Sequence, residues 1–209
     1  MTAATAERRR LADTLLAVGP DAPTLCHPWA ARDLAAHLVI RERRPDAAVG
    51  ILAKPLAAYT DKVQREQANG PWTELVDHVR NGPPIWSPTR VAAIDRAVNT
   101  VEFFVHHEDV LRAVEGWAPR QLDPELTFDL AAALGRAKLL VRKSPVGIVL
   151  APTDGGKTVT AKAGEPSVTV SGPVGELVLW VYGRQAHAVV GYVGDDAAIE
   201  AVRTARFGI

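Results

Sequence analysis

The residue pattern of this chain changes near Gly116, and that change limits the folds available to it. Before Gly116, Ala, Leu, Val and Arg recur at helical spacing, whereas after about Ser144 β-branched residues alternate with polar ones. The first pattern is typical of helices with one buried face, and the second of half-buried strands. The run 116–122 joins a helix-ending Gly to a Pro. We therefore predict an α+β protein with two domains, residues 1–116 and 123–209.

The first domain is expected to be an up-and-down bundle of four main helices joined by short connections. Its helices are predicted over residues 5–18, 31–44, 46–68 with a break at Pro55, 72–81 and 89–114. The second domain is expected to be a small α+β unit. Its predicted elements are a helix from Asp123, strands over 146–150, 158–162 and 168–171, and helices over 173–182 and 195–206.

Charge and composition exclude several classes of function. Lys plus Arg and Asp plus Glu number 24 each, so the basic excess of a phosphate-neutralising nucleic-acid binder is missing. Cys26 is the single cysteine, which fits a reducing compartment. The sequence shows no secretory signal pattern and no apolar run of about 20 residues that could span a membrane. We predict a soluble cytoplasmic protein that binds neither nucleic acid nor membranes, in an oligomeric state that the sequence leaves open.

The segment 98–111 holds the residues with the clearest chemistry. On a helix, Glu102 and His106 are four residues apart and therefore stack on one side. Asp95, Asn99 and Asp109 extend the same polar stripe, and apolar residues flank it on both edges. A partly buried stripe of ionisable groups must be paired or bound to a metal.

One face of this helix is predicted to form the core of the bundle, because apolar side chains gather there. The residues of this predicted core face are Ile94, Val98, Val101, Phe104, Val105 and Leu111. His107 lies about 100° around the helix from His106 and is expected at the surface.

A metal needs more ligands than one Glu–His pair supplies, and the helix over 31–44 offers His37 among apolar neighbours. If the two helices are neighbours, His37, Glu102 and His106 meet inside the bundle. Two imidazoles and one carboxylate form a common catalytic zinc set with one position open for water or substrate. The alternatives are a surface ion pair at Glu102–His106 and a packed core histidine at position 37.

Other polar residues near these three are candidates for supporting roles. Asp33 or Asp109 is predicted to orient a ligand imidazole, as carboxylates beside metal sites often do. Arg41 is predicted to meet an anionic group of the substrate, with a solvated salt bridge as the alternative. Cys26 is either a small buried residue, an extra ligand or a redox-active thiol.

Two stretches of the sequence resemble the DinB-like superfamily, and within it the mycothiol-dependent maleylpyruvate isomerase-like proteins. They are Pro28-Trp29 with Arg32-Asp33-Leu34-Ala35-Ala36-His37-Leu38, and Glu102-Phe103-Phe104-Val105-His106-His107-Glu108-Asp109. The resemblance implies a metal held by His37, Glu102 and His106. The run 41–46 is similar to a narrower metal-binding branch of the family. The second domain resembles the family's sterol-carrier-like domain through weaker motifs. The family usually has Ser or Thr after the Trp, whereas this chain has Ala30.

Two functions are consistent with these observations. In the first, the resemblance implies a metal-dependent thiol transferase or isomerase, with a divalent metal, preferably Zn²⁺, and mycothiol as cosubstrate acting on an electrophilic small molecule. In the second, the protein is a non-catalytic lipid- or small-molecule-binding module with a structural or vestigial metal. The apolar run 177–181 motivates the second function, although that helix could simply cover the sheet. The sequence does not specify the substrate, the reaction or the metal.

Overall fold

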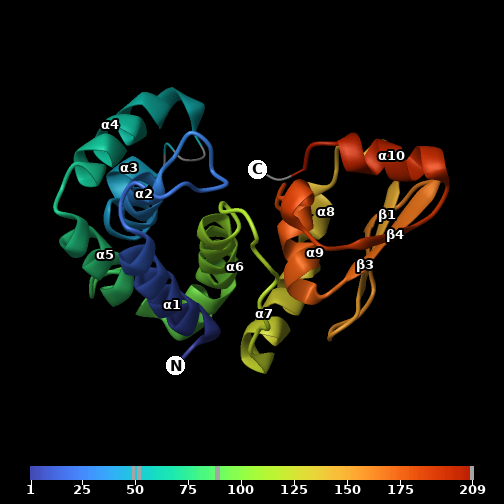
Figure 1. Ribbon diagram of the computed structural model, residues 1–209, viewed down its shortest axis with the longest axis horizontal. Helices are drawn as coiled ribbons and strands as arrows, with labels where there is room; N and C mark the ends of the chain where they lie inside the picture. Colours follow the sequence, from blue (N-terminus) through green and yellow to red (C-terminus); the bar gives the residue numbers. More distant parts are fainter. Residues whose placement is uncertain (49, 51–52, 88–89, 208–209) are drawn as a thin grey trace. The chain divides into compact units, whose positions relative to one another are not determined.

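The computed structural model describes residues 1–48, 50, 53–87 and 90–207 (Figure 1). It divides into two compact units, Met1–Trp117 and Ala118–Ile209, and each is treated by itself below. The division lies inside the run 116–122. Helices and a four-stranded sheet are both present, so the structure is mixed α and β, as the sequence predicts.

Unit 1 is helical in its described secondary structure, apart from an isolated β-bridge between Pro23 and Ala30. Its α-helices are α1 (Ala3–Val18), α2 (Ala31–Arg43), α3 (Pro45–Ala48), α4 (Ala57–Ala68), α5 (Trp72–Asn81) and α6 (Ala92–Leu111). The predicted break at Pro55 falls in the 3₁₀ turn η2 (Lys54–Leu56) between α3 and α4. Helix α6 begins at Ala92, and the predicted start at Thr89 lies outside the described residues.

The start of α2 shows what replaces the missing Ser or Thr cap at Ala30. The first amide groups of the helix donate to carbonyls of the preceding loop, Ala31 to Ala22 and Arg32 to Pro20. The Ala30 amide donates to the Asp33 carboxylate at 3.0 Å. These bonds satisfy groups that a helix start leaves without internal partners, so α2 begins where the sequence predicts.

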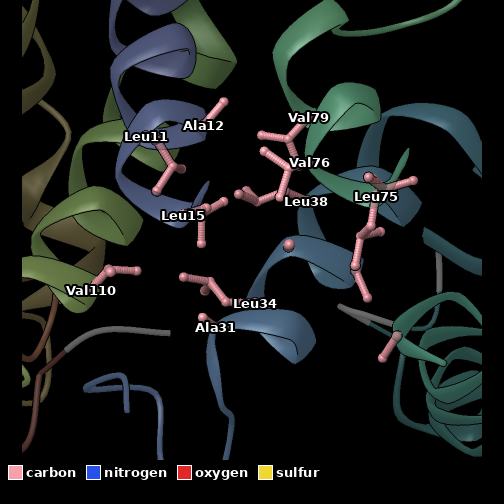
Figure 2. Packing of buried hydrophobic residues seen from close by; sticks show 14 of the residues in the cluster. Leu11, Ala12, Leu15, Ala31, Leu34, Leu38, Leu75, Val76, Val79 and Val110 are labelled. Carbon is pink, nitrogen blue, oxygen red and sulfur yellow. The ribbon is translucent and has the colours of Figure 1, made fainter. Parts of the chain in front are cut away.

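The core of unit 1 is an apolar cluster to which α1, α2, α5 and α6 all contribute. Leu11 and Leu15 of α1 meet Leu34 of α2 and Val76 of α5 there, and Figure 2 shows these side chains gathered between their helices. Helix α1 packs against α5 and α6, and α2 packs against α4 and α5. This packing holds α2 and α6, which contain the predicted ligands, in one folded unit.

The predicted core face of α6 is only partly correct. Val101, Phe104 and Val105 are buried, but Ile94 is 38% exposed and Val98 is 46% exposed. Phe103 and Val110, which flank the polar stripe, belong to the apolar cluster instead. The prediction assumed that α6 buries one apolar face. In its second half α6 is buried on several sides, so the polar stripe and the apolar residues beside it both lie inside the unit.

Unit 2 combines helices with a sheet of strand order β2-β1-β3-β4. Its elements are α7 (Pro124–Leu134), α8 (Ala137–Leu140), β1 (Gly147–Pro152), β2 (Val159–Lys162), β3 (Ser167–Gly172), α9 (Val174–Val181), η4 (Gln185–His187), β4 (Gly191–Val193) and α10 (Asp196–Thr204). Strands β1 and β3 are parallel, and the other two pairings are antiparallel. The sequence analysis missed the short strand β4, because Gly191 begins it and Gly194 follows it, and glycines weaken a strand pattern.

Helix α9 covers the sheet. It packs against β1 and β3, and α7 packs on α9 (Figure 1). All five residues of the apolar run 177–181 are buried in this packing. The run that suggested lipid binding is therefore explained by the core of unit 2. No helix in the described ranges has the length and apolar character needed to cross a membrane.

Candidate metal centre

The structure brings His37, Glu102 and His106 together within unit 1. His37 lies in the middle of α2, and Glu102 and His106 lie one turn apart on α6. Their ligand atoms all lie within 4.8 Å of one another. The four-residue spacing on α6 places two of these groups on one side of the helix, and the packing of unit 1 supplies the third.

Glu102 Oε1 lies at the centre of this cluster. His37 Nε2, His106 Nε2 and Arg41 Nε are each 3.3 Å from this oxygen. The two imidazole rings meet edge to face at 5.4 Å between centroids. Both histidines are buried, whereas the Glu102 side chain remains 24% exposed. The cluster is thus largely buried, and its contact with solvent is through the Glu102 side chain.

The second nitrogen of His106 has a separate set of partners. Its Nδ1 lies 2.9 Å from Asp109 Oδ2, and the Cys26 thiol donates to the same oxygen at 3.0 Å. Cys26 Sγ is 3.7 Å from Nδ1 of His106. Cys26, His106 and Asp109 therefore form a second group with metal-binding geometry, and the two groups share the His106 ring.

A non-helical segment between α1 and α2 covers this side of the cluster. The Leu25 amide donates to the Asp109 carbonyl at 3.0 Å, which fixes the segment to the end of α6. The Trp29 ring lies 5.1 Å from the His37 ring. Cys26 and Trp29 pack partly buried against the apolar cluster. The segment therefore places a thiol and an aromatic ring beside the two histidines.

Burial and hydrogen bonding set opposite charge preferences on the two histidines. Burial lowers the pKa of His37 below its ordinary value, and the nearby His106 adds to this effect. Burial also disfavours charge on His106, but hydrogen bonds to Asp109, Cys26 and Glu102 outweigh it and hold its pKa well above the ordinary value. The same contacts hold the pKa of Glu102 well below its ordinary value against the effect of burial.

The structure separates the three predicted supporting residues. Asp109 contacts His106 directly. Asp33 instead caps α2 through the Ala30 amide. Arg41 contacts Glu102 through Nε and donates from Nη1 to Asn99 Oδ1 at 2.6 Å, so its guanidinium is held by the protein itself.

Sequence reasoning missed a buried ionic network that adjoins the cluster through Asn99. Arg8 binds both carboxylate oxygens of Glu42, at 2.5 and 2.7 Å, and contacts Asp95 at 3.3 Å. Asn99 donates to Glu42 at 3.0 Å and to Asp95 at 2.8 Å. Arg8 and Glu42 carry no signal of burial in the sequence, because charged residues on helices usually face solvent.

The prediction for His107 was wrong. Its ring is only 4% exposed, with Nδ1 2.8 Å from Glu7 Oε1 and Nε2 2.9 Å from Thr14 Oγ1. Helix α1 covers this side of α6 and supplies both partners. The helical spacing predicts that the His107 ring points about 100° away from His106. It does not predict that α1 packs against that side of α6.

The residues of the first cluster fit a divalent metal. Two imidazole nitrogens and a carboxylate oxygen form a ligand set that suits zinc and neighbouring transition metals. The contact of His106 Nδ1 with Asp109 matches the carboxylate–histidine arrangement that orients metal-binding imidazoles.

Comparison with known proteins shows a related fold. No family model and no curated protein sequence matches the chain. A crystal structure of the mycothiol-dependent maleylpyruvate isomerase is similar at a TM-score of 0.54 and 16% identity, covering 91% of this chain and 90% of that one. A histidine-to-alanine variant of that isomerase gives a TM-score of 0.57 and 14% identity, covering 90% of this chain and 88% of that one. At such identities the likeness concerns the fold.

Proposed function

We propose that His37, Glu102 and His106 bind a divalent metal, zinc by the chemistry of the donor set, and that the protein is a thiol-dependent transferase or isomerase of the mycothiol type. The convergence of three ligand atoms within 4.8 Å carries the metal assignment. The similarity of fold to a mycothiol-dependent isomerase over nine-tenths of the chain supports the thiol assignment. The proposal includes a DinB-like bundle in unit 1 and a sterol-carrier-like fold in unit 2.

A metal with an open coordination position would act as a Lewis acid that lowers the pKa of a thiol and favours its nucleophilic thiolate form. The chain's own residues prepare the position. Asp109 accepts from Nδ1 of His106, so Nε2 faces Glu102 and His37. Arg41 fixes the Glu102 carboxylate from the other direction. Loading the site would require His106 to release its Nε2 proton, so metal binding should release protons.

The metal assignment is tested by metal analysis of the purified full chain and by titration with zinc. We expect about one equivalent per chain and a rise in melting temperature on adding zinc to chelator-treated protein. His37→Ala, Glu102→Gln and His106→Ala should each abolish both results, whereas His78→Ala on α5, outside the cluster, should keep them. Far less than one equivalent with no thermal shift would overturn the metal site.

The thiol assignment is tested separately on the metal-loaded protein. Mycothiol and a maleylpyruvate-like electrophile should be consumed with a rate that depends on protein, thiol and metal together. Binding of metal without any thiol-dependent turnover or thiol binding would refute the enzymatic assignment while leaving the metal site in place.

The alternative is a non-catalytic binding module with a structural metal, and one observation supports it. Unit 2 contains a cavity of about 740 Å³ beside α7, where Phe128 remains 73% exposed. If this cavity binds apolar molecules, fatty acids should change the tryptophan fluorescence of the protein in a saturable way. A fourth protein ligand on the metal would likewise favour the structural role.

A further inference from the structure

A second cavity, distinct from the candidate metal centre, lies within unit 1. Its volume is about 580 Å³, and it is bounded by the start of α1, the end of α5 with the following residues, and the start of α6. None of the three proposed metal ligands lines it. Cavities of this size accommodate small organic ligands.

The lining of this cavity is strongly basic. Four arginines contribute to it, namely Arg8, Arg9, Arg80 and Arg90, and Asp95 is the one carboxylate among its described lining residues. Four guanidinium groups around one opening favour anionic ligands, because guanidinium binds carboxylate and phosphate oxygens in pairs.

Two of the four arginines are already neutralised by the protein. Arg8 is buried and held by Glu42 and Asp95. Arg80 contacts Asp13 at 2.7 Å. These two residues shape the wall and contribute less to a ligand.

The other two arginines have charges available for a ligand. Arg9 and Arg90 are exposed, and within the described ranges neither has a carboxylate partner. The printed side-chain contact of Arg9 is with the Met1 sulfur, a weak acceptor that an oxyanion would replace at little cost.

The single carboxylate of the lining opposes an anion less than its charge suggests. Asp95 Oδ1 accepts from Asn99 and Arg8, and Oδ2 accepts from Thr2 and Thr5. Four donors therefore surround a carboxylate that is itself buried. Arg9 and Arg90 are therefore the lining charges that remain available to contact a ligand.

We propose that this cavity binds a small organic anion with a phosphate or carboxylate group, held by Arg9 and Arg90. The proposal does not depend on the proposed enzymatic function, because it uses different residues. Gly82 forms part of the wall, and a Cβ there would clash with the Arg8 guanidinium that Glu42 holds.

The test is calorimetric titration of the full chain, treated with chelator so that no metal competes for the anion. Inorganic pyrophosphate and succinate are the two probes. We expect saturable binding of at least one of them, weakened by salt as for any charge-driven contact. Arg9→Gln and Arg90→Gln should each weaken binding about tenfold, the loss of a charge-assisted contact.

The controls separate this site from general charge effects and from the metal centre. Arg65→Gln, on the exposed face of α4, removes the same charge outside the cavity and should leave affinity unchanged. His106→Ala should also bind the probes normally. Preference for pyrophosphate would indicate a phosphorylated ligand, and preference for succinate a carboxylate. No saturable binding of either probe, or equal weakening by Arg65→Gln, would overturn the proposal.

Discussion

Each ring nitrogen of His106 contacts a different carboxylate, Nε2 with Glu102 and Nδ1 with Asp109. One side chain therefore joins both groups of possible metal ligands. Because Asp109 is 0% exposed, its charge acts on the ring with little screening by water. Metal binding at Nε2 of His106 would use the group with His37 and Glu102, whereas metal binding at Nδ1 would use the group with Cys26 and Asp109.

Asp109→Asn should weaken zinc binding by roughly 10–100-fold, because the ligand imidazole loses the carboxylate that orients it. Competition with a chromogenic chelator measures the affinity. Asp61→Asn on α4 removes an exposed carboxylate and should have no effect. An unchanged affinity in Asp109→Asn would show that the carboxylate plays no part in metal binding.

Cys26→Ser distinguishes the two groups directly. Serine can still donate to Asp109, so zinc affinity should stay close to that of the wild type if metal binds at Nε2 of His106. Loss of zinc binding in Cys26→Ser, with retention in His37→Ala, would place the metal on the Cys26, His106 and Asp109 group instead.

Glu42 gives a pH dependence of stability that can be measured without metal. Burial raises the pKa of its carboxyl above the ordinary value, even against the contact with Arg8. The folded state therefore binds the Glu42 proton more tightly than the unfolded state does. The stability gained from this proton is fully present below the ordinary pKa of glutamate, and it is lost as pH rises through the raised pKa of the folded state. Each pH unit between the two pKa values is worth about 1.4 kcal/mol.

The expected result is that the wild type loses stability relative to Glu42→Gln as pH rises from the ordinary glutamate pKa toward neutrality, because only the wild type carries a titratable group at position 42. Urea unfolding of both chelator-treated proteins at each pH gives the difference. A gain of the wild type over this range would contradict the assignment and would mean that the Arg8 contact dominates the ionisation of Glu42.

At the scale of elements, α2 places His37 because its first turn is anchored by backbone carbonyls of the loop and by Asp33. Asp33→Ala should therefore destabilise the protein by about 1 kcal/mol, the usual cost of a lost helix cap. Its zinc affinity should match the wild type once the protein is folded. Weakened zinc binding at unchanged stability would instead assign Asp33 to the metal centre. Urea unfolding and chelator competition provide the two measurements.

The ends of α5 and α1 offer a matched pair of glycine substitutions. Gly82 and Gly19 both end helices with positive φ, at 71° and 84°, but only Gly82 lies against another group, the Arg8 guanidinium. Both changes to alanine incur the backbone penalty, and Gly82→Ala adds a clash with a side chain that Glu42 holds in place. We expect Gly82→Ala to be more destabilising by about 1–3 kcal/mol, and equal losses would show that Arg8 moves freely.

The sequence predicts the elements better than the contacts between them. The spacing of Glu102 and His106 is local information, and the helix alone determines that they share a side. His37 joins these two residues only if α2 and α6 are neighbours in the fold, and the sequence alone could not establish that they are. Partners such as Glu7 for His107 could not be predicted, because buried ion pairs on helices look like surface residues in a sequence.

At the scale of the whole molecule, the candidate metal centre and the basic cavity both belong to unit 1. Zinc should therefore slow hydrogen exchange in peptides from α2 and α6 and leave those from β1 and β3 unchanged. Exchange mass spectrometry with and without zinc tests this, and His106→Ala is the control that should show no effect. Protection of the sheet on zinc binding would show that the two units are coupled.

The Leu25 amide and the Cys26 thiol both donate to Asp109, so the segment between Gly19 and Trp29 lies against the end of α6 beside the histidines. Residues 24–28 of this segment lie outside the contacts of Pro20 and Ala22 that anchor α2, so their side chains can vary more freely than Asp109 and His106, which α6 holds in place. Substitutions at residues 24–28 should therefore alter the surroundings of the histidines without disturbing the start of α2. A directed-evolution library confined to these residues would diversify chemistry while preserving the scaffold.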